Sequence, residues 1–355
     1  MPATMQQPLG VGRALVVLSL AIVGTGSAAA VDSTAAPLKN RTIGYVLTSE
    51  HWGVYRGADV KTQCPEGLND GPREQFQVLY SHNEERRSLL NTQLARESAV
   101  WFPATWNDTL PFHEGSGKIA IGMNLDGKVG PNDFISPDGE PGIDNQLYRA
   151  IGCIDSYRGP DGNHYYSTNK YMQEWNYNRT IIELTGVDSL TNDSDVLVTI
   201  YRGLDPLLTD ATGNDFVPGG SQRIDRRWGE QFVQHFRGRI VDGVLNTEAA
   251  DVVLPEPAPF ESPTIQTIYG LRFRLKLTPD RAEGLMAGYA DVDGFYYQLN
   301  KAWSTHLQSY GHISSPSLYK ALHRLADGYP DPTTGVNTAI SSALEVKFVQ
   351  AYIQH

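Results

Sequence analysis

Residues 180–277 contain the runs TIIELTGVDS (180–189), DVLVTIYRGL (195–204), QHFRGRIVDGVL (234–245), DVVL (251–254) and TIYGLRFRLKL (267–277). Valine, isoleucine, threonine and aromatic residues favour strands. Turn residues (Gly, Asp, Asn and Pro) separate the runs, a pattern typical of a β-sandwich or a β-barrel. We predict a β-rich α+β fold, with a central antiparallel β-sandwich of the jelly-roll type and flanking helices.

The flanking sequence mixes helix and strand signals. Residues 42–55 have strand composition, whereas 73–98 have few breakers and apolar residues at helical intervals, which predicts a helix. A short helix is expected at 145–157 and another at 317–328. Residues 282–303 are expected to begin as loop and end as helix, and 329–353 to form a turn followed by a strand or helix. These signals divide the mature chain into a mixed region, 43–178, and the sandwich with its C-terminal helices, 179–355, packed as one unit.

The N-terminal residues 1–30 resemble a secretory leader. Arg13 precedes the apolar run ALVVLSLAIVG (14–24), and small residues ending in Ala28, Ala29 and Ala30 follow. The apolar run is shorter than the roughly 20 residues that a spanning helix needs. We therefore predict an exported protein, periplasmic or extracellular, with no membrane span after leader cleavage and a flexible lead-in at 31–42.

The charge and the cysteine content limit the kinds of partner and of cross-link that the protein can have. The chain has 40 acidic residues against 29 Lys and Arg, a formal net charge of −11. A nucleic-acid partner is disfavoured because phosphate binding requires a basic surface. Cys64 and Cys153 are the two cysteines of the chain. In an oxidising compartment they favour one disulfide, the alternative being two buried thiols.

The window IGMNLDGKVGPNDFISPDGEPGIDNQ (121–146) combines five carboxylates and a single lysine with Asn, Gly and Pro. Dense carboxylates repel one another unless water or a cation separates them. Oxygen ligands converging from such a loop suit Ca²⁺. The predicted ligands are the side chains of Asn124, Asp126 and Asp133, the Lys128 carbonyl, and Asp138 or Asp144. The alternative is a solvated turn region without an ion, because turns use the same residues.

Residues 122–133 of this window resemble part of an EF-hand loop of the dockerin kind. Asn124, Asp126 and Gly127 match its third, fifth and sixth positions, and Asp133 stands where the last ligand is expected. The match covers only this loop, and Gly122 replaces the first ligand. The C-terminal stretch ALHRLADGYPDPTTGVNTAIS (321–341) resembles segments of exported bacterial proteins of unassigned function.

No complete catalytic motif is present in the sequence. We predict a calcium-stabilised binding or surface-associated protein without catalytic activity, whose partner is a carbohydrate or a cell-surface component. One alternative is a secreted polysaccharide hydrolase with paired carboxylates, for which Glu174 is a candidate. A second alternative is a structural protein with no bound ion.

Overall fold

The computed structural model describes residues 38, 40–69, 95–96, 99–100, 112–158, 169–170, 172–174, 179–256, 264–301 and 315–355. Residues 35–355 form one compact unit. The predicted leader, residues 1–30, lies outside the described residues. Among the described helices, none has the length and apolar character that crossing a membrane requires.

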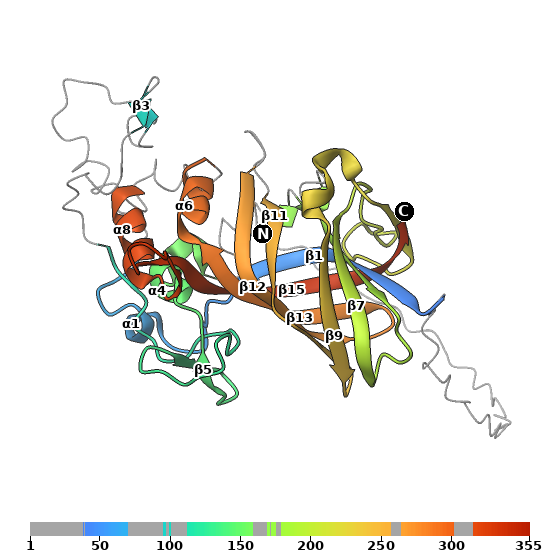
Figure 1. Cartoon of the computed structure of the whole chain (residues 1–355), viewed down its shortest axis with the longest axis horizontal. Helices are drawn as coiled ribbons and strands as arrows, with labels where there is room; N and C mark the ends of the chain where they lie inside the picture. Colours follow the sequence, from blue (N-terminus) through green and yellow to red (C-terminus); the bar gives the residue numbers. More distant parts are fainter. Residues whose placement is uncertain are drawn as a thin grey trace, which may run out of the picture. The chain divides into compact units, whose positions relative to one another are not determined.

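Eight antiparallel strands form a closed barrel (Figure 1). Each strand pairs with two neighbours, and β1 closes the ring by pairing with both β6 and β15. In order around the barrel the strands are β1 (Thr42–Trp52), β6 (Thr180–Thr185), β7 (Asp193–Arg202), β9 (Gln234–Val241), β10 (Val244–Thr247), β12 (Thr264–Leu277), β13 (Arg281–Asp291) and β15 (Asn337–Gln354).

The predicted β-sandwich is therefore wrong, although the predicted strands are present. Alternating apolar and polar residues give a strand one buried face, and a sandwich and a barrel both satisfy that pattern. Closure depends on β1, which lies more than a hundred residues before β6 in the chain. Local sequence does not encode a pairing between such distant segments.

The barrel interior is a continuous hydrophobic core. Along β7, the inward residues Val196, Val198 and Ile200 alternate with Leu197 and Thr199, which face outward. The same alternation in the other strands contributes further core residues, among them Tyr45, Leu184, Phe236, Leu245, Phe273, Leu275, Met286, Val346 and Phe348. Phe236 and Phe273 pack edge to face, with ring centroids 5.7 Å apart.

A bulge in β1 changes which side chains face the core. The register shifts between Leu47 and Ser49, so that Ser49 lies opposite Lys347 and Glu50 lies opposite the buried Val346. An extra residue in one strand reverses the alternation beyond it. Glu50 therefore lies on the inner face, whereas simple alternation from Leu47 would place it outside.

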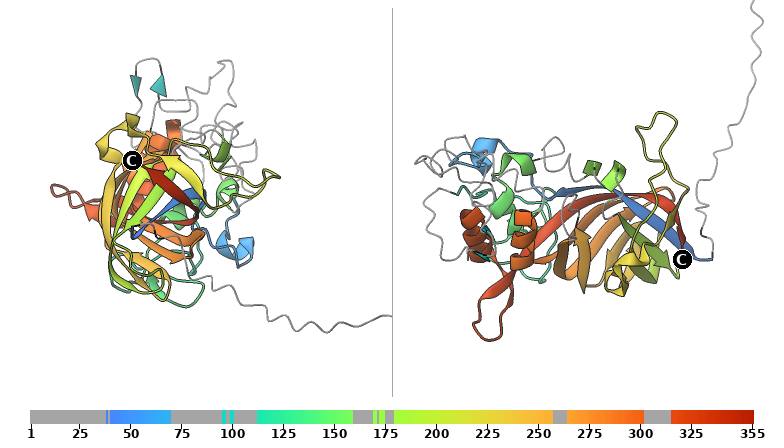
Figure 2. Two further views of the ribbon diagram at one scale, coloured as in Figure 1. Left: turned by 90° about the vertical axis from the view of Figure 1, so that its right-hand side faces the viewer. Right: turned by 90° about the horizontal axis from the view of Figure 1, so that it is seen from above.

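Helices and loops form a second core at the end of the barrel opposite the end of β15 (Figures 1 and 2). The helices are α4 (Leu147–Ile151), α6 (Val292–Lys301) and α8 (Ser315–Leu325). Their apolar residues include Tyr148, Ile151, Phe295, Leu318 and Leu322. The disulfide Cys64–Cys153, with Cα atoms 5.7 Å apart, joins this core to the segment after α1 (Val60–Gln63), which confirms the predicted cystine.

One loop prediction is wrong, and one helix prediction is contradicted only at its end. Residues 282–291, expected to be loop, belong to β13, whose Gly284 and Ala287 pair with Val346 and Ala343. The predicted helix 73–98 lies largely outside the described residues, and at its end Ala95–Arg96 pairs as a strand with Ala99–Val100. At residues 95–96, strand pairing overrides the helical spacing of the apolar residues.

The remaining elements are short. They are β2 (Ala95–Arg96), β3 (Ala99–Val100), β4 (Phe134–Ile135), β5 (Pro141–Ile143), β8 (Gly220–Arg223), β11 (Ala250–Glu256), β14 (Gly328–Pro330) and the 3₁₀ turns η2 (Asp155–Tyr157), η3 (Arg226–Trp228) and η4 (Glu230–Phe232). β8 continues the sheet by pairing in parallel with the end of β15, and β11 pairs with β12.

Candidate functional site

A groove runs across the outer wall of the barrel. Its floor is one row of directly paired residues, because cross-strand partners share a face of the sheet. Ala351 of β15 pairs with Gly44 of β1, and Gly44 pairs with Glu183 of β6. Glu183 pairs with Thr199 of β7, and Thr199 pairs with His235 of β9. The residues at one end of this row, Ala351 and Gly44, are small, and the three that follow, Glu183, Thr199 and His235, are polar.

The small end of the row depends on Gly44. A Cβ atom on this residue would lie 2.5 Å from Cγ1 of Ile353 and 2.7 Å from the Ala351 carbonyl oxygen. Glycine therefore permits the close approach of β15 and of the Ile353 side chain. This approach places the last residues of β15 beside Glu183.

Glu183 is the central polar residue of the groove, and its side chain is only 6 % exposed. Its carboxylate lies 3.1 Å from Nε2 of His355 and accepts a 3.4 Å hydrogen bond from the Tyr201 hydroxyl. A buried carboxylate requires such partners, because its desolvation is costly. Burial raises the pKa of Tyr201, and the negative charge of Glu183 raises it further. The phenol therefore stays protonated and can donate a hydrogen bond.

The groove, which we call the Glu183 groove, encloses about 590 Å³. This volume lies within the roughly 300–1,000 Å³ typical of small-molecule sites. Thr199 and His235 add a further hydrogen bond, with Oγ1 and Nδ1 3.1 Å apart. The other lining residues are Asn40, Thr42, Ile43, Gly44, Thr185, Leu197, Gln350, Ala351, Tyr352 and Ile353. Among the described lining residues Glu183 is the one carboxylate, and none is Lys or Arg.

The loop between β7 and β8 packs on the outer wall of the barrel next to the groove. Its Leu207 and Phe216 pack on the outward-facing Val46, Ile181 and Val349. The apolar outer wall is thus covered at this level of the barrel. The Glu183 groove begins where the cover ends, at Ala351 and Ile353.

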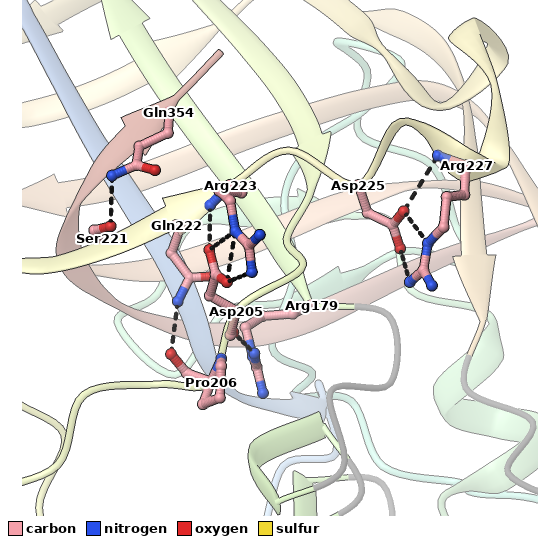
Figure 3. Close-up of polar contacts among 9 residues, drawn as sticks. All are labelled: Arg179, Asp205, Pro206, Ser221, Gln222, Arg223, Asp225, Arg227 and Gln354. Carbon is pink, nitrogen blue, oxygen red and sulfur yellow. Dashed lines mark hydrogen bonds and ion pairs between the residues drawn. The ribbon is translucent and has the colours of Figure 1, made fainter.

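Charged hydrogen bonds hold this loop to the barrel (Figure 3). Arg223 Nε donates to Oδ1 of Asp205 at 2.9 Å, and its guanidinium faces the carboxylate in the close-up. These bonds lower the pKa of Asp205. Gln222 donates to the Pro206 carbonyl at 2.9 Å, and Gln354 donates to the Ser221 hydroxyl at 2.8 Å. The end of β15, which borders the groove, is thereby attached to β8.

Arg179 also binds the loop between β7 and β8, from a buried position. Its side chain is fully buried and donates to the carbonyls of Asp205, Met172 and Gln173. Burial lowers the pKa of Arg179 to about 10, so it stays charged at neutral pH. Beside it, Asp225 accepts two hydrogen bonds from Arg227, at 2.8 and 2.9 Å. The hydrogen bonds that these residues form lie within the protein and fix the loop, while Nε of Arg179 has no partner among the described residues.

The predicted calcium ligands lie in one loop, in which Asn124, Asp126 and Asp133 each accept a hydrogen bond from a backbone amide. Asn124 accepts from Gly127 N and donates to the Lys128 carbonyl, each at 2.7 Å. Asp126 accepts from Lys128 N at 2.8 Å, and Asp133 accepts from Gly130 N. These bonds stabilise tight turns of the kind that Asn and Asp favour.

The other two predicted ligands, Asp144 and Asp138, differ in their burial. Asp144 is buried and accepts from the amides of Leu125 and Asp126, at 2.6 and 3.2 Å, whereas Asp138 is exposed. Burial raises the pKa of Asp144, and these amide hydrogen bonds oppose the rise. The described residues contain no group of three His, Cys, Asp or Glu side chains placed to hold a metal ion. The calcium site stays a prediction.

Sequence reasoning missed the Glu183 groove. The available signal was Glu183 itself, a charge flanked by Ile182 and Leu184 inside a strand. His355 and Tyr201 gave no signal, because only the pairing of distant strands brings them to Glu183. Glu174, the candidate for hydrolysis, is exposed and lies 3.7 Å from Lys170 in an ion pair, and it does not line the groove.

Comparison of the chain with protein-family models, with curated proteins and with solved structures gives no match.

Proposed function

We propose that the protein is an exported binding protein that holds a hydroxyl-rich ligand, of the carbohydrate class, in the Glu183 groove. The observation that carries the proposal is the buried Glu183 carboxylate on the groove floor, between Tyr201 and His355. A desolvated carboxylate is a strong acceptor for ligand hydroxyl groups. The exposed ring of Tyr352 at the rim offers an apolar face for a sugar ring.

Binding is favoured over hydrolysis by the number of carboxylates. Glycoside hydrolysis generally uses two carboxyl groups, about 5–9.5 Å apart. Among the described residues that line the groove, Glu183 is the only one with a side-chain carboxylate. Export is supported by the Cys64–Cys153 disulfide, because such bonds persist in oxidising compartments.

The test measures binding of short cello-, xylo- and malto-oligosaccharides by isothermal titration calorimetry. For a bound oligosaccharide, Glu183→Gln is expected to weaken affinity at least tenfold, since hydrogen bonds to charged groups contribute roughly 1.5–3 kcal/mol. Glu248→Gln, which removes an exposed carboxylate elsewhere, is the matched control. Equal affinity of the Glu183→Gln variant and the native protein would refute the proposed site. Absence of binding to every oligosaccharide would refute the carbohydrate class.

A further inference from the structure

A second hollow, of about 490 Å³, lies on the outer wall over β12, β13 and β15. Two adjacent rows of paired residues build it. One row joins Lys276 of β12, Glu283 of β13 and Lys347 of β15. The next row joins Leu285 of β13 and Glu345 of β15 to His51 of β1. Arg56, from the segment after β1, completes the lining.

The β1 bulge is what brings His51 into this hollow. Because the register shifts at Ser49, His51 lies opposite Glu345 on the outer face, and Glu50 turns inward. The Ser49 hydroxyl lies 3.1 Å from Nε2 of His51. The hollow thus has a titratable imidazole on one side and the apolar Leu285 within its lining.

Positive charge exceeds negative charge in this hollow, in a chain whose net charge is −11. Arg56, Lys276 and Lys347 face two carboxylates, Glu283 and Glu345. In the described part of the chain, no carboxylate lies within ion-pairing distance of any of the three cations. Because none of the three forms an ion pair with a described carboxylate, these cations are available to an anionic ligand.

The direction of the His51 pKa shift agrees with a positive electrostatic potential in the hollow. Burial lowers the pKa of His51, and the charges of Arg56 and Lys347 lower it further. The same two cations oppose the rise that burial causes in the pKa of Glu345. Arg56 and Lys347, which come from different segments, therefore act on the same point of the hollow.

We propose that this hollow, the Lys347 hollow, binds an oxyanion group: a sulfate, a phosphate or a carboxylate. Arg56, Lys276 and Lys347 supply the counter-charge, and Leu285 contacts the apolar part of the molecule that carries the group. Glu283, between the two lysines, limits affinity and selects against weakly charged ligands. The site shares none of its lining residues with the Glu183 groove.

The experiment follows the imidazole signals of the full mature chain by NMR, with His51→Gln to assign the His51 signal. Sodium sulfate, sodium phosphate and sodium acetate are titrated separately, with sodium chloride at matched ionic strength as the reference. A bound oxyanion offsets Arg56 and Lys347, so the His51 pKa is expected to rise with saturation. The three salts distinguish which oxyanion the hollow prefers.

Charge variants separate a built site from general screening. Lys347→Gln is expected to weaken binding about threefold, the size typical of one exposed charge pair, and Glu283→Gln to strengthen it about threefold. A gain on Glu283→Gln cannot arise from damage to the fold. Lys118→Gln, which removes an exposed charge outside the hollow, is the matched control and should leave binding unchanged.

Two results would overturn the proposal. One is a His51 pKa that responds to all three oxyanions no more than to chloride. The other is a Lys118→Gln variant that loses as much affinity as Lys347→Gln. Oligosaccharide affinity of the Lys347→Gln variant should equal that of the native protein, so failure here is distinguishable from failure at the Glu183 groove.

Discussion

Replacing both half-cystines with alanine (Cys64→Ala/Cys153→Ala) is expected to lower the free energy of unfolding by about 4–5 kcal/mol. The bond closes a loop of 89 residues in sequence separation. The chain-entropy model gives about 4.6 kcal/mol for a loop of this length, because the cross-link restricts the unfolded chain. Both cysteines are buried, so the two cavities left by the sulfur atoms add to the loss.

Urea unfolding of the oxidised native protein and of the double variant, followed by tryptophan fluorescence, measures this difference. The slope of the free energy with urea should rise in the variant, because an unfolded chain without the cross-link exposes more surface. The native protein unfolded in dithiothreitol is the control and should match the variant. Equal free energies of unfolding for the native and variant proteins would refute the reasoning, and would mean that the loop is held closed by other contacts even in the unfolded state.

Three further predictions concern the barrel and the acidic loop. Burial raises the pKa of Glu50 from 4.5 to about 7, because the folded protein favours the protonated carboxyl. The contribution of Glu50 to stability is therefore fully present below pH 4.5 and is lost as the pH rises through about 7. Glu50→Gln should therefore stabilise the protein at pH 8, by up to about 3 kcal/mol, and not at pH 4; equal gains at both pH values would contradict this. Phe273→Ala should cost about 3–5 kcal/mol in a urea melt, against almost nothing for the exposed Arg239→Ala. Calcium and EDTA should leave the melting temperature unchanged, because backbone amides already donate to one carboxylate oxygen of Asp126 and to one of Asp144; a calcium-dependent rise that Asp126→Ala abolishes would support the calcium site instead.

The strands of the barrel were largely accessible from local sequence. Runs such as 180–189 and 195–204 predict strands because they are rich in β-branched residues and are bounded by turn residues. The cystine was accessible too, because an isolated cysteine pair in a chain that is predicted to be exported favours a disulfide. In the acidic window, the density of Asp, Asn and Gly correctly indicated turns, but the same residues are used by turns with and without an ion.

Only the tertiary structure decided how the sheet closes and where the sites lie. Closure requires β1 to pair with β6 and β15, and these pairings join segments that no local pattern links. The β1 bulge then reverses the side-chain alternation, which sends Glu50 into the barrel and His51 into the Lys347 hollow. The Glu183 groove arises likewise, because strand register sets Glu183 beside the end of β15. Local sequence favours the strands themselves, whereas long-range pairing decides which residues face the core and what each face contacts.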